Sequence, residues 1–88
     1  MPYRVLVTTE GARHLRRLPE EIRTAVLAAI FERIAAEPYQ AGKALRGELE
    51  GLRSARRGDY RVIYEIDEPR QAVIIHRAQH SRAAYRRR

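Results

Sequence analysis

The 88-residue chain contains no cysteine, no tryptophan and no long apolar run. The absence of cysteine excludes disulfide bonds and thiolate metal sites. Without a long apolar run there is no candidate transmembrane helix, and residues 1–13 lack the apolar stretch of a signal peptide. We therefore expect a cytoplasmic protein with a single domain over residues 1–88, whose small size limits its core.

The motifs of several enzyme classes are also missing. The chain has no pair of carboxylates at a catalytic spacing, no glycine-rich phosphate loop, no Ser/His/Asp arrangement and no metal-ligand cluster. These absences argue against a metal-dependent nuclease and predict that no cofactor is needed. RNA permits cleavage without a metal, because its own 2′-hydroxyl is the nucleophile and the protein need only position it and neutralise charge.

Positive charge is abundant and unevenly distributed. The chain carries 18 Lys and Arg against 11 Asp and Glu, and Lys43 is the single lysine. Residues 1–40 hold six basic and five acidic residues, a net charge of +1, whereas residues 41–88 hold twelve and six, a net charge of +6. Genomic base composition could explain the preference for arginine but does not explain this asymmetry. The second half is therefore expected to bind a polyanion such as RNA.

The first half of the chain predicts a strand followed by two helices. Residues 3–8 alternate as a short strand, and residues 10–18 show helical spacing after a threonine that can cap the helix. A second helix is expected to begin at Pro19 and to end near Glu37, because Pro38 follows. Its apolar stripe consists of Ile22, Val26, Ile30 and Ile34.

In the second half the hydrophobic period changes to two, which indicates strands. Residues 38–48 are expected to be loop, and a short helix is the most that the basic tail from Gln79 is expected to form. Strands are predicted at residues 52–57, 60–66 and 72–78, separated by turns at 58–59 and 67–70. The resulting order β-α-α-β-β-β predicts an α+β domain, with a helical hairpin packed on a small, mainly antiparallel sheet.

The hairpin around Gly58-Asp59 carries the first candidate site. A two-residue loop there places Arg56 directly opposite Arg61 on one face of the sheet. Like charges in this position destabilise a sheet, and an anion bound between the two guanidinium groups would offset that cost. The alternative is that both arginines are solvated surface residues, and the argument depends on the register.

A second cluster, formed by His80, Arg82 and Tyr85, follows the last predicted strand. His80 could transfer a proton near neutral pH, and Tyr85 could stack on a base or take part in proton transfer. A basic tail with a rim histidine and a packing tyrosine is the simpler alternative. His76 should share a face with His80 if the strand extends that far, and His14 is expected at the surface.

Residues 45–66 and the C-terminal segment 80–86 resemble the RelE toxins of the RelE/ParE superfamily of type II toxin–antitoxin systems. The specific part is Arg-x-Gly-Asp-Tyr-Arg-Val-Ile-Tyr at 56–64, and His-x-Arg-x-x-Tyr at 80–85 is a weaker match. The resemblance covers essentially the whole chain. It implies a metal-independent endoribonuclease that enters the decoding site of the 70S ribosome and cleaves mRNA by 2′-hydroxyl attack.

Carried over by this resemblance, Arg61 would hold the scissile phosphate with help from Arg56. Tyr85 would orient or deprotonate the 2′-hydroxyl. His80 and Arg82 would be candidates for proton donation and charge stabilisation. Further RNA-binding candidates are Lys43, Arg46, Arg53, Arg57, Arg77 and Arg86.

The sequence departs from the family pattern at three positions. The best-known RelE toxins have two lysines on the strand before the turn, where this chain has Leu52 and Ser54. Many relatives have arginine directly after the C-terminal histidine, where this chain has Ser81. These differences leave the general acid and base, and the toxicity of this copy, open.

The resemblance also implies a partner and leaves two rival functions. A RelB-like antitoxin would cover the basic face with a partly acidic segment in a hetero-oligomer. One rival is a ParE-like toxin that inhibits DNA gyrase without cutting. The other is a non-catalytic RNA-binding module, which the shortage of exposed aromatic residues disfavours. A membrane-surface role is disfavoured because the basic residues do not follow one amphipathic helix.

Overall fold

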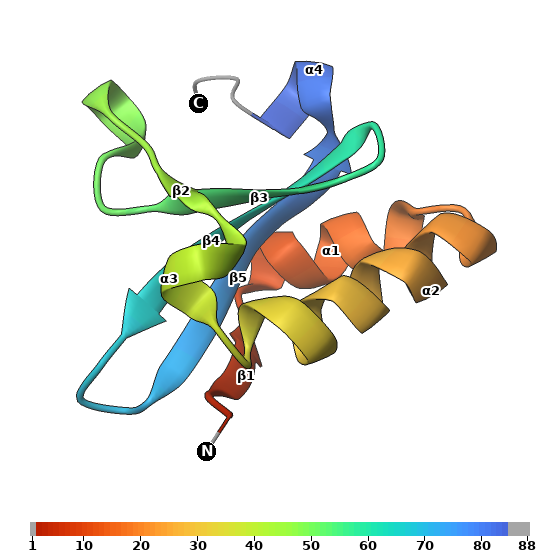
Figure 1. The fold of residues 1–88 in the computed structure, drawn as a ribbon. Helices are drawn as coiled ribbons and strands as arrows, with labels where there is room; N and C mark the ends of the chain where they lie inside the picture. The colour runs from red at the N-terminus through yellow and green to blue at the C-terminus, as the bar shows by residue number, and fades with distance from the viewer. Residues whose placement is uncertain (1, 85–88) are drawn as a thin grey trace.

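The computed structural model describes residues 2–84 as a layer of helices packed on one face of a five-stranded sheet (Figure 1). The strand order is β1-β5-β4-β3-β2, and every neighbouring pair is antiparallel except β1 and β5. This confirms the predicted α+β class and the mainly antiparallel sheet. The strands are β1 (Arg4–Val7), β2 (Lys43–Ala44), β3 (Arg53–Arg57), β4 (Tyr60–Asp67) and β5 (Ala72–His80).

The helical hairpin is also confirmed. Helix α1 spans Thr9–Arg17, and the Thr8 hydroxyl caps it by accepting a 2.9 Å hydrogen bond from the Gly11 N–H. Helix α2 spans Glu20–Ala29 and continues as the π-helical turn η1 (Ile30–Ile34). The predicted apolar stripe lies along α2 and η1, and its last three residues are almost completely buried.

The prediction that residues 38–48 are only loop was wrong. This segment contains the short helix α3 (Pro38–Ala41), strand β2 and the 3-10 turn η2 (Gly47–Leu49). Arg53 holds the segment by donating from its guanidinium to the carbonyls of Tyr39 (2.9 Å) and Gly42 (2.8 Å). Elements of two to four residues are too short to produce a periodic pattern, and their stability comes from these tertiary contacts.

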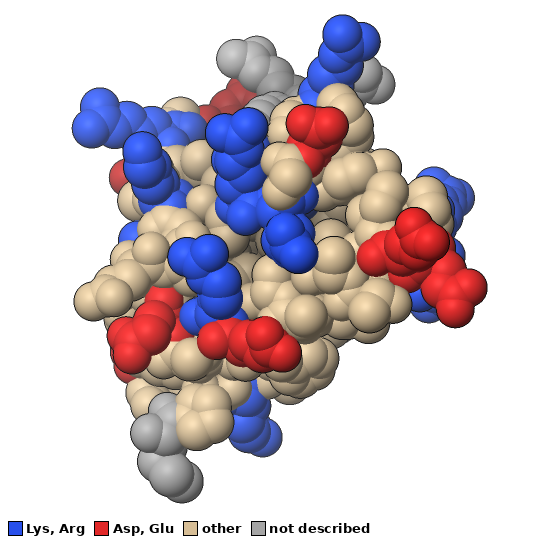
Figure 2. Space-filling model, turned by 45° about the vertical axis from the view of Figure 1, so that its right-hand side comes forward, with Lys and Arg blue, Asp and Glu red and all other residues tan. Residues whose placement is uncertain are grey.

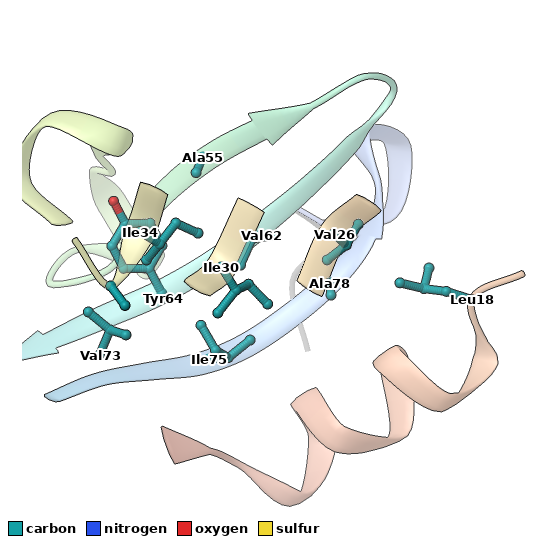
Figure 3. Close-up of a cluster of buried hydrophobic side chains, with 11 residues drawn as sticks. Leu18, Val26, Ile30, Ile34, Ala55, Val62, Tyr64, Val73, Ile75 and Ala78 are labelled. Carbon is teal, nitrogen blue, oxygen red and sulfur yellow. The ribbon is translucent and has the colours of Figure 1, made fainter. Parts of the chain in front are cut away.

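The core lies between α2 and the sheet (Figure 3). Val26, Ile30 and Ile34 from the helix pack on alternate residues of β4 and β5, which is the face that the sequence pattern predicts. Tyr64 is fully buried there, and its hydroxyl donates a 2.7 Å hydrogen bond to the Pro38 carbonyl. The helices therefore cover one face of the sheet, and the other face carries polar and basic side chains around the buried Ile63.

A β-bulge in β5 changes which side chains reach that other face. Ile63 pairs with Arg77, but Tyr64 pairs with Ile75, so His76 is an extra residue in β5. Val73 and Ile75 face the helices before the bulge, and Ala78 faces them after it. The expectation that His76 and His80 share a face was therefore wrong.

The bulge is supported by His14, which is buried rather than exposed as predicted. The edge of β5 is unpaired beyond the end of β1, and the Ala78 N–H donates a 3.2 Å hydrogen bond to Nδ1 of His14 there. Burial lowers the pKa of His14, although Glu10 opposes this shift. A neutral histidine thus satisfies a strand N–H that the sheet leaves open.

Candidate functional site

The candidate site is a row of three side chains on the sheet face opposite the helices. Arg56 of β3 pairs with Arg61 of β4, as predicted from the two-residue turn, and Arg61 pairs with Gln79 of β5. Directly opposed residues point to the same face with their Cβ atoms about 4.5–5.5 Å apart. The neighbouring Ala55, Val62 and Ala78 belong to the core on the other side, which fixes the orientation of the row.

Arg61 is the best placed of the three to bind an anion. It is half-buried, and its Nε is inaccessible to solvent and has no hydrogen-bond partner within residues 2–84. Arg56 is exposed, and its Nε donates a 3.2 Å bond to the Gly58 carbonyl. The Nε of Arg53 is buried and unpartnered in the same way, so this feature is not specific to Arg61, and a bound phosphate would meet the terminal nitrogens of the guanidinium.

A second row lies beside the first and joins all four antiparallel strands. It runs from Lys43 through Ser54 and Ile63 to Arg77. Lys43 is exposed, whereas Arg77 is only 6% exposed and donates a 2.8 Å bond to the Ala84 carbonyl. Arg77 was expected to bind RNA, but its observed contact holds the C-terminal helix.

That helix, α4 (Ser81–Ala84), follows β5 directly and lies, like η2, on the side of the sheet away from α1 and α2 (Figure 1). Ser81 ties it to the Arg56/Arg61 hairpin, because both its N–H and its hydroxyl donate 2.9 Å bonds to the Asp59 carbonyl. At the position where relatives carry arginine, serine here fixes the hairpin turn to the end of β5.

Three other candidates point toward the helices instead. Arg53 contacts the carbonyls next to α3, and Arg57 lines a pocket of about 320 Å³ between α2 and the hairpin turn. His80 pairs with Tyr60, and their rings meet edge to face at 5.6 Å between centroids. The structure therefore does not place Arg53, Arg57 or His80 beside Arg61.

The remaining candidates are peripheral or lie outside the described part. Arg46 and Arg82 are exposed, and the N–H of Arg82 donates to Nδ1 of His80 at 3.3 Å. Tyr85 and Arg86 lie outside the described residues 2–84. Sequence reasoning missed Gln79, because only the bulge in β5 reveals that it is the cross-strand neighbour of Arg61.

Basic side chains are frequent on one view of the surface. Figure 2 shows several Lys and Arg side chains near the centre of this view, with acidic side chains directly beside them and a further acidic group at the right-hand edge. Within residues 2–84, no group of three or more His, Asp or Glu side chains could hold a metal ion. No helix in the described part is both long enough and apolar enough to cross a membrane.

A polar cluster at the opposite end of β4 has a different character. The Tyr3 and Tyr39 hydroxyls both donate to the Glu68 carboxylate, which lowers the pKa of Glu68 and raises that of Tyr39 to about 12. These bonds join the start of β1, α3 and the β4–β5 turn. The cluster lies at the far end of β4 from Arg61, so we assign it no part in the site.

The fold is that of a RelE-like toxin. The isolated RelE toxin of E. coli superposes with a TM-score of 0.75 over 94% of this chain and 88% of that chain, and its 16% identity supports the fold alone. The toxin–antitoxin complex RelBE2 of Mycobacterium tuberculosis contains a chain with a TM-score of 0.87 and 45% identity, covering 91% of this chain and 92% of that one.

Sequence comparison extends the likeness from the fold to the family. The family model described as the ParE toxin of the type II toxin–antitoxin system parDE matches residues 5–85. Toxin RelE of M. tuberculosis is 51% identical over 97% of this chain and 88% of its own length, and toxin RelG of the same organism is 46% identical over 99% and 100%. The chain belongs to the RelE/ParE family of type II toxins.

Proposed function

We propose that this toxin is a ribosome-dependent endoribonuclease that cleaves mRNA in the decoding site without a metal ion. The observation that carries the proposal is the row of Arg56 and Arg61, two cations that the pairing of β3 with β4 places side by side on one face of the sheet. Identity to the toxins RelE and RelG, near one half over full length, supports the same activity.

The proposed chemistry uses the 2′-hydroxyl of the message as nucleophile. It attacks the adjacent phosphorus, the bond to the 5′-oxygen breaks, and a 2′,3′-cyclic phosphate and a 5′-hydroxyl are formed. Arg61 holds the phosphate and stabilises the charge that develops on its oxygens, and Arg56 adds a second cation. Tyr85 is the proposed acceptor of the 2′-hydroxyl proton, and the departing 5′-oxygen takes a proton from solvent to give the 5′-hydroxyl. Arg82 is the exposed cation on α4 and is proposed to stabilise charge.

The family also points to a partner. Solved complexes titled RelBE2 and RelBE pair a RelE toxin with its antitoxin. A RelB-like antitoxin with an acidic segment would find complementary charge on the arginine row and would block it. The proposed substrate, an mRNA in a ribosome, places the protein in the cytoplasm.

A matched pair of arginine variants on the same hairpin tests the proposal. Arg57 ends β3 and Arg61 lies near the start of β4, so both belong to the same hairpin but point to opposite faces. Primer extension on a defined mRNA in a purified translation system should show cuts at ribosome-positioned codons. Arg61→Ala should abolish these cuts, whereas Arg57→Ala should retain most of the activity, because only Arg61 is proposed to contact the phosphate.

The other outcomes separate the rival functions. An equal loss of cleavage in Arg61→Ala and Arg57→Ala would mean that cleavage depends on the total positive charge of the hairpin and not on the arginine row. If the wild type cuts nothing with or without ribosomes, the nuclease proposal fails. Inhibition of DNA supercoiling by gyrase would then support the ParE-like alternative, which the matching family model also encompasses.

A further inference from the structure

Gln79 occupies a place beside Arg61 that none of the sequence motifs marks. It is the direct cross-strand partner of Arg61, so Arg61 has Arg56 on one side and Gln79 on the other. The Gln79 side chain is half-buried. Gln79 thus lies about one strand spacing from the arginine that is proposed to hold the phosphate.

The chemistry of the amide suits a base better than a phosphate. A phosphate offers acceptors only, and Arg56 and Arg61 already supply charged donors. A glutamine amide presents a donor and an acceptor side by side, which is the pattern needed to pair with the edge of a nucleobase. Contacts to phosphate fix position, whereas contacts to base edges carry sequence information.

We propose that Gln79 is a specificity-determining residue that hydrogen-bonds the base next to the phosphate held by Arg61. This inference rests on the proposed function and deepens it. The β5 bulge is essential to the assignment, because without the extra His76 the side chain of residue 79 would face the helices. Gln79, the other half-buried residue of the row, is uncharged and is proposed to contact a base of the mRNA.

The test measures discrimination rather than activity alone. Single-stranded RNA oligonucleotides carry one 2′-deoxy nucleotide at the cut position, so that they cannot be cleaved, and differ only in the adjacent base. Their affinities for the full-length toxin are measured by fluorescence anisotropy. Gln79→Met keeps the length of the side chain but removes hydrogen bonding, and it should change the affinity ratio between the best and worst base by about 5-fold or more.

A charge variant with a matched control completes the design. Gln79→Glu should weaken binding of every oligonucleotide, because it places a carboxylate beside the bound phosphate. Gln40→Glu makes the same charge change at an exposed position on α3 and should have a much smaller effect. Unfolding curves for each variant verify that the fold is kept.

The outcomes separate this inference from the proposed function. If Gln79→Met leaves the affinity ratio unchanged and Gln79→Glu behaves like Gln40→Glu, the role of Gln79 is overturned even when Arg61→Ala abolishes cleavage. If the ratio changes as expected but ribosomes charged with mRNA are not cut, Gln79 still reads a base while the nuclease proposal fails.

Discussion

Protonation of His14 should destabilise the protein at mildly acidic pH. Nδ1 of His14 accepts the Ala78 N–H at 3.2 Å, and a proton on Nδ1 would remove this acceptor. The bond holds the end of β5 just after the bulge that directs Arg77 and Gln79 to the face of Arg61. The perturbation therefore reaches the candidate site as well as the core.

The sign of the effect follows from the direction of the shift. Burial is the largest influence and lowers the pKa of His14, with Arg77, Arg13 and Arg17 acting in the same direction and only Glu10 opposing them. Because the folded state favours the neutral ring, this stabilisation is complete above the unfolded pKa of about 6.5 and is lost as the pH falls toward the folded pKa. One proton gives at most about 1.4 kcal/mol of unfolding free energy per pH unit.

Urea unfolding at pH 7.5, 6.5 and 5.5 measures this loss against a His14→Asn variant. The asparagine oxygen can accept from the Ala78 N–H but does not titrate, so the variant should lose less stability on acidification. His76 and His80 are present in both proteins, so their contribution cancels in the comparison. Equal losses in the two proteins would show that His14 does not couple folding to pH and would refute the reasoning.

Three further predictions concern other contacts. Tyr64→Phe removes the buried donor to the Pro38 carbonyl and should cost about 1–2 kcal/mol, which lowers Tm by roughly 4–16 °C in a thermal melt; an unchanged Tm would contradict the importance of this bond. Arg56→Ala should reduce the salt dependence of RNA binding, the slope of log affinity against log salt falling by about 0.7, and an unchanged slope would mean that Arg56 does not contact phosphate. Ser81→Ala deletes the hydrogen bond from the hydroxyl to the Asp59 carbonyl and should slow cleavage about 2- to 12-fold. Ser81→Thr keeps a hydroxyl and should preserve the rate. Equal cleavage rates in the wild type and both variants would show that Ser81 does not position α4.

The central register of the sheet was predictable because it depends on local chemistry. Gly58 has a positive φ of 61°, which glycine adopts without strain, and a two-residue turn leaves a single pairing for the strands it joins. The opposition of Arg56 and Arg61 follows directly from that turn. The apolar stripe of the second helix was equally clear, since burial of that stripe is what stabilises the helix.

The features that were missed depend on contacts between distant segments. No glycine or proline marks the bulge at His76, whose ring instead bonds Glu65 of the neighbouring strand at 3.0 Å. His14 is buried because a strand 64 residues away leaves an N–H open. The bulge at His76 and the burial of His14 both depend on how the lengths of neighbouring strands match across the sheet. A single sequence carries no local signal for this match.

Contacts between distant segments also give some basic residues in the second half of the chain a structural role. The net charge of +6 in this half suggested a broad polyanion-binding surface, but Arg53 and Arg77 donate to backbone carbonyls of α3, its flank and α4. Two of the arginines thus stabilise the short segments that flank the sheet face and are not available as mobile phosphate contacts. If the proposed function holds, the row of Arg56 and Arg61 supplies the central phosphate contacts, and the loss of Arg61 is therefore expected to affect cleavage far more than the loss of Arg57.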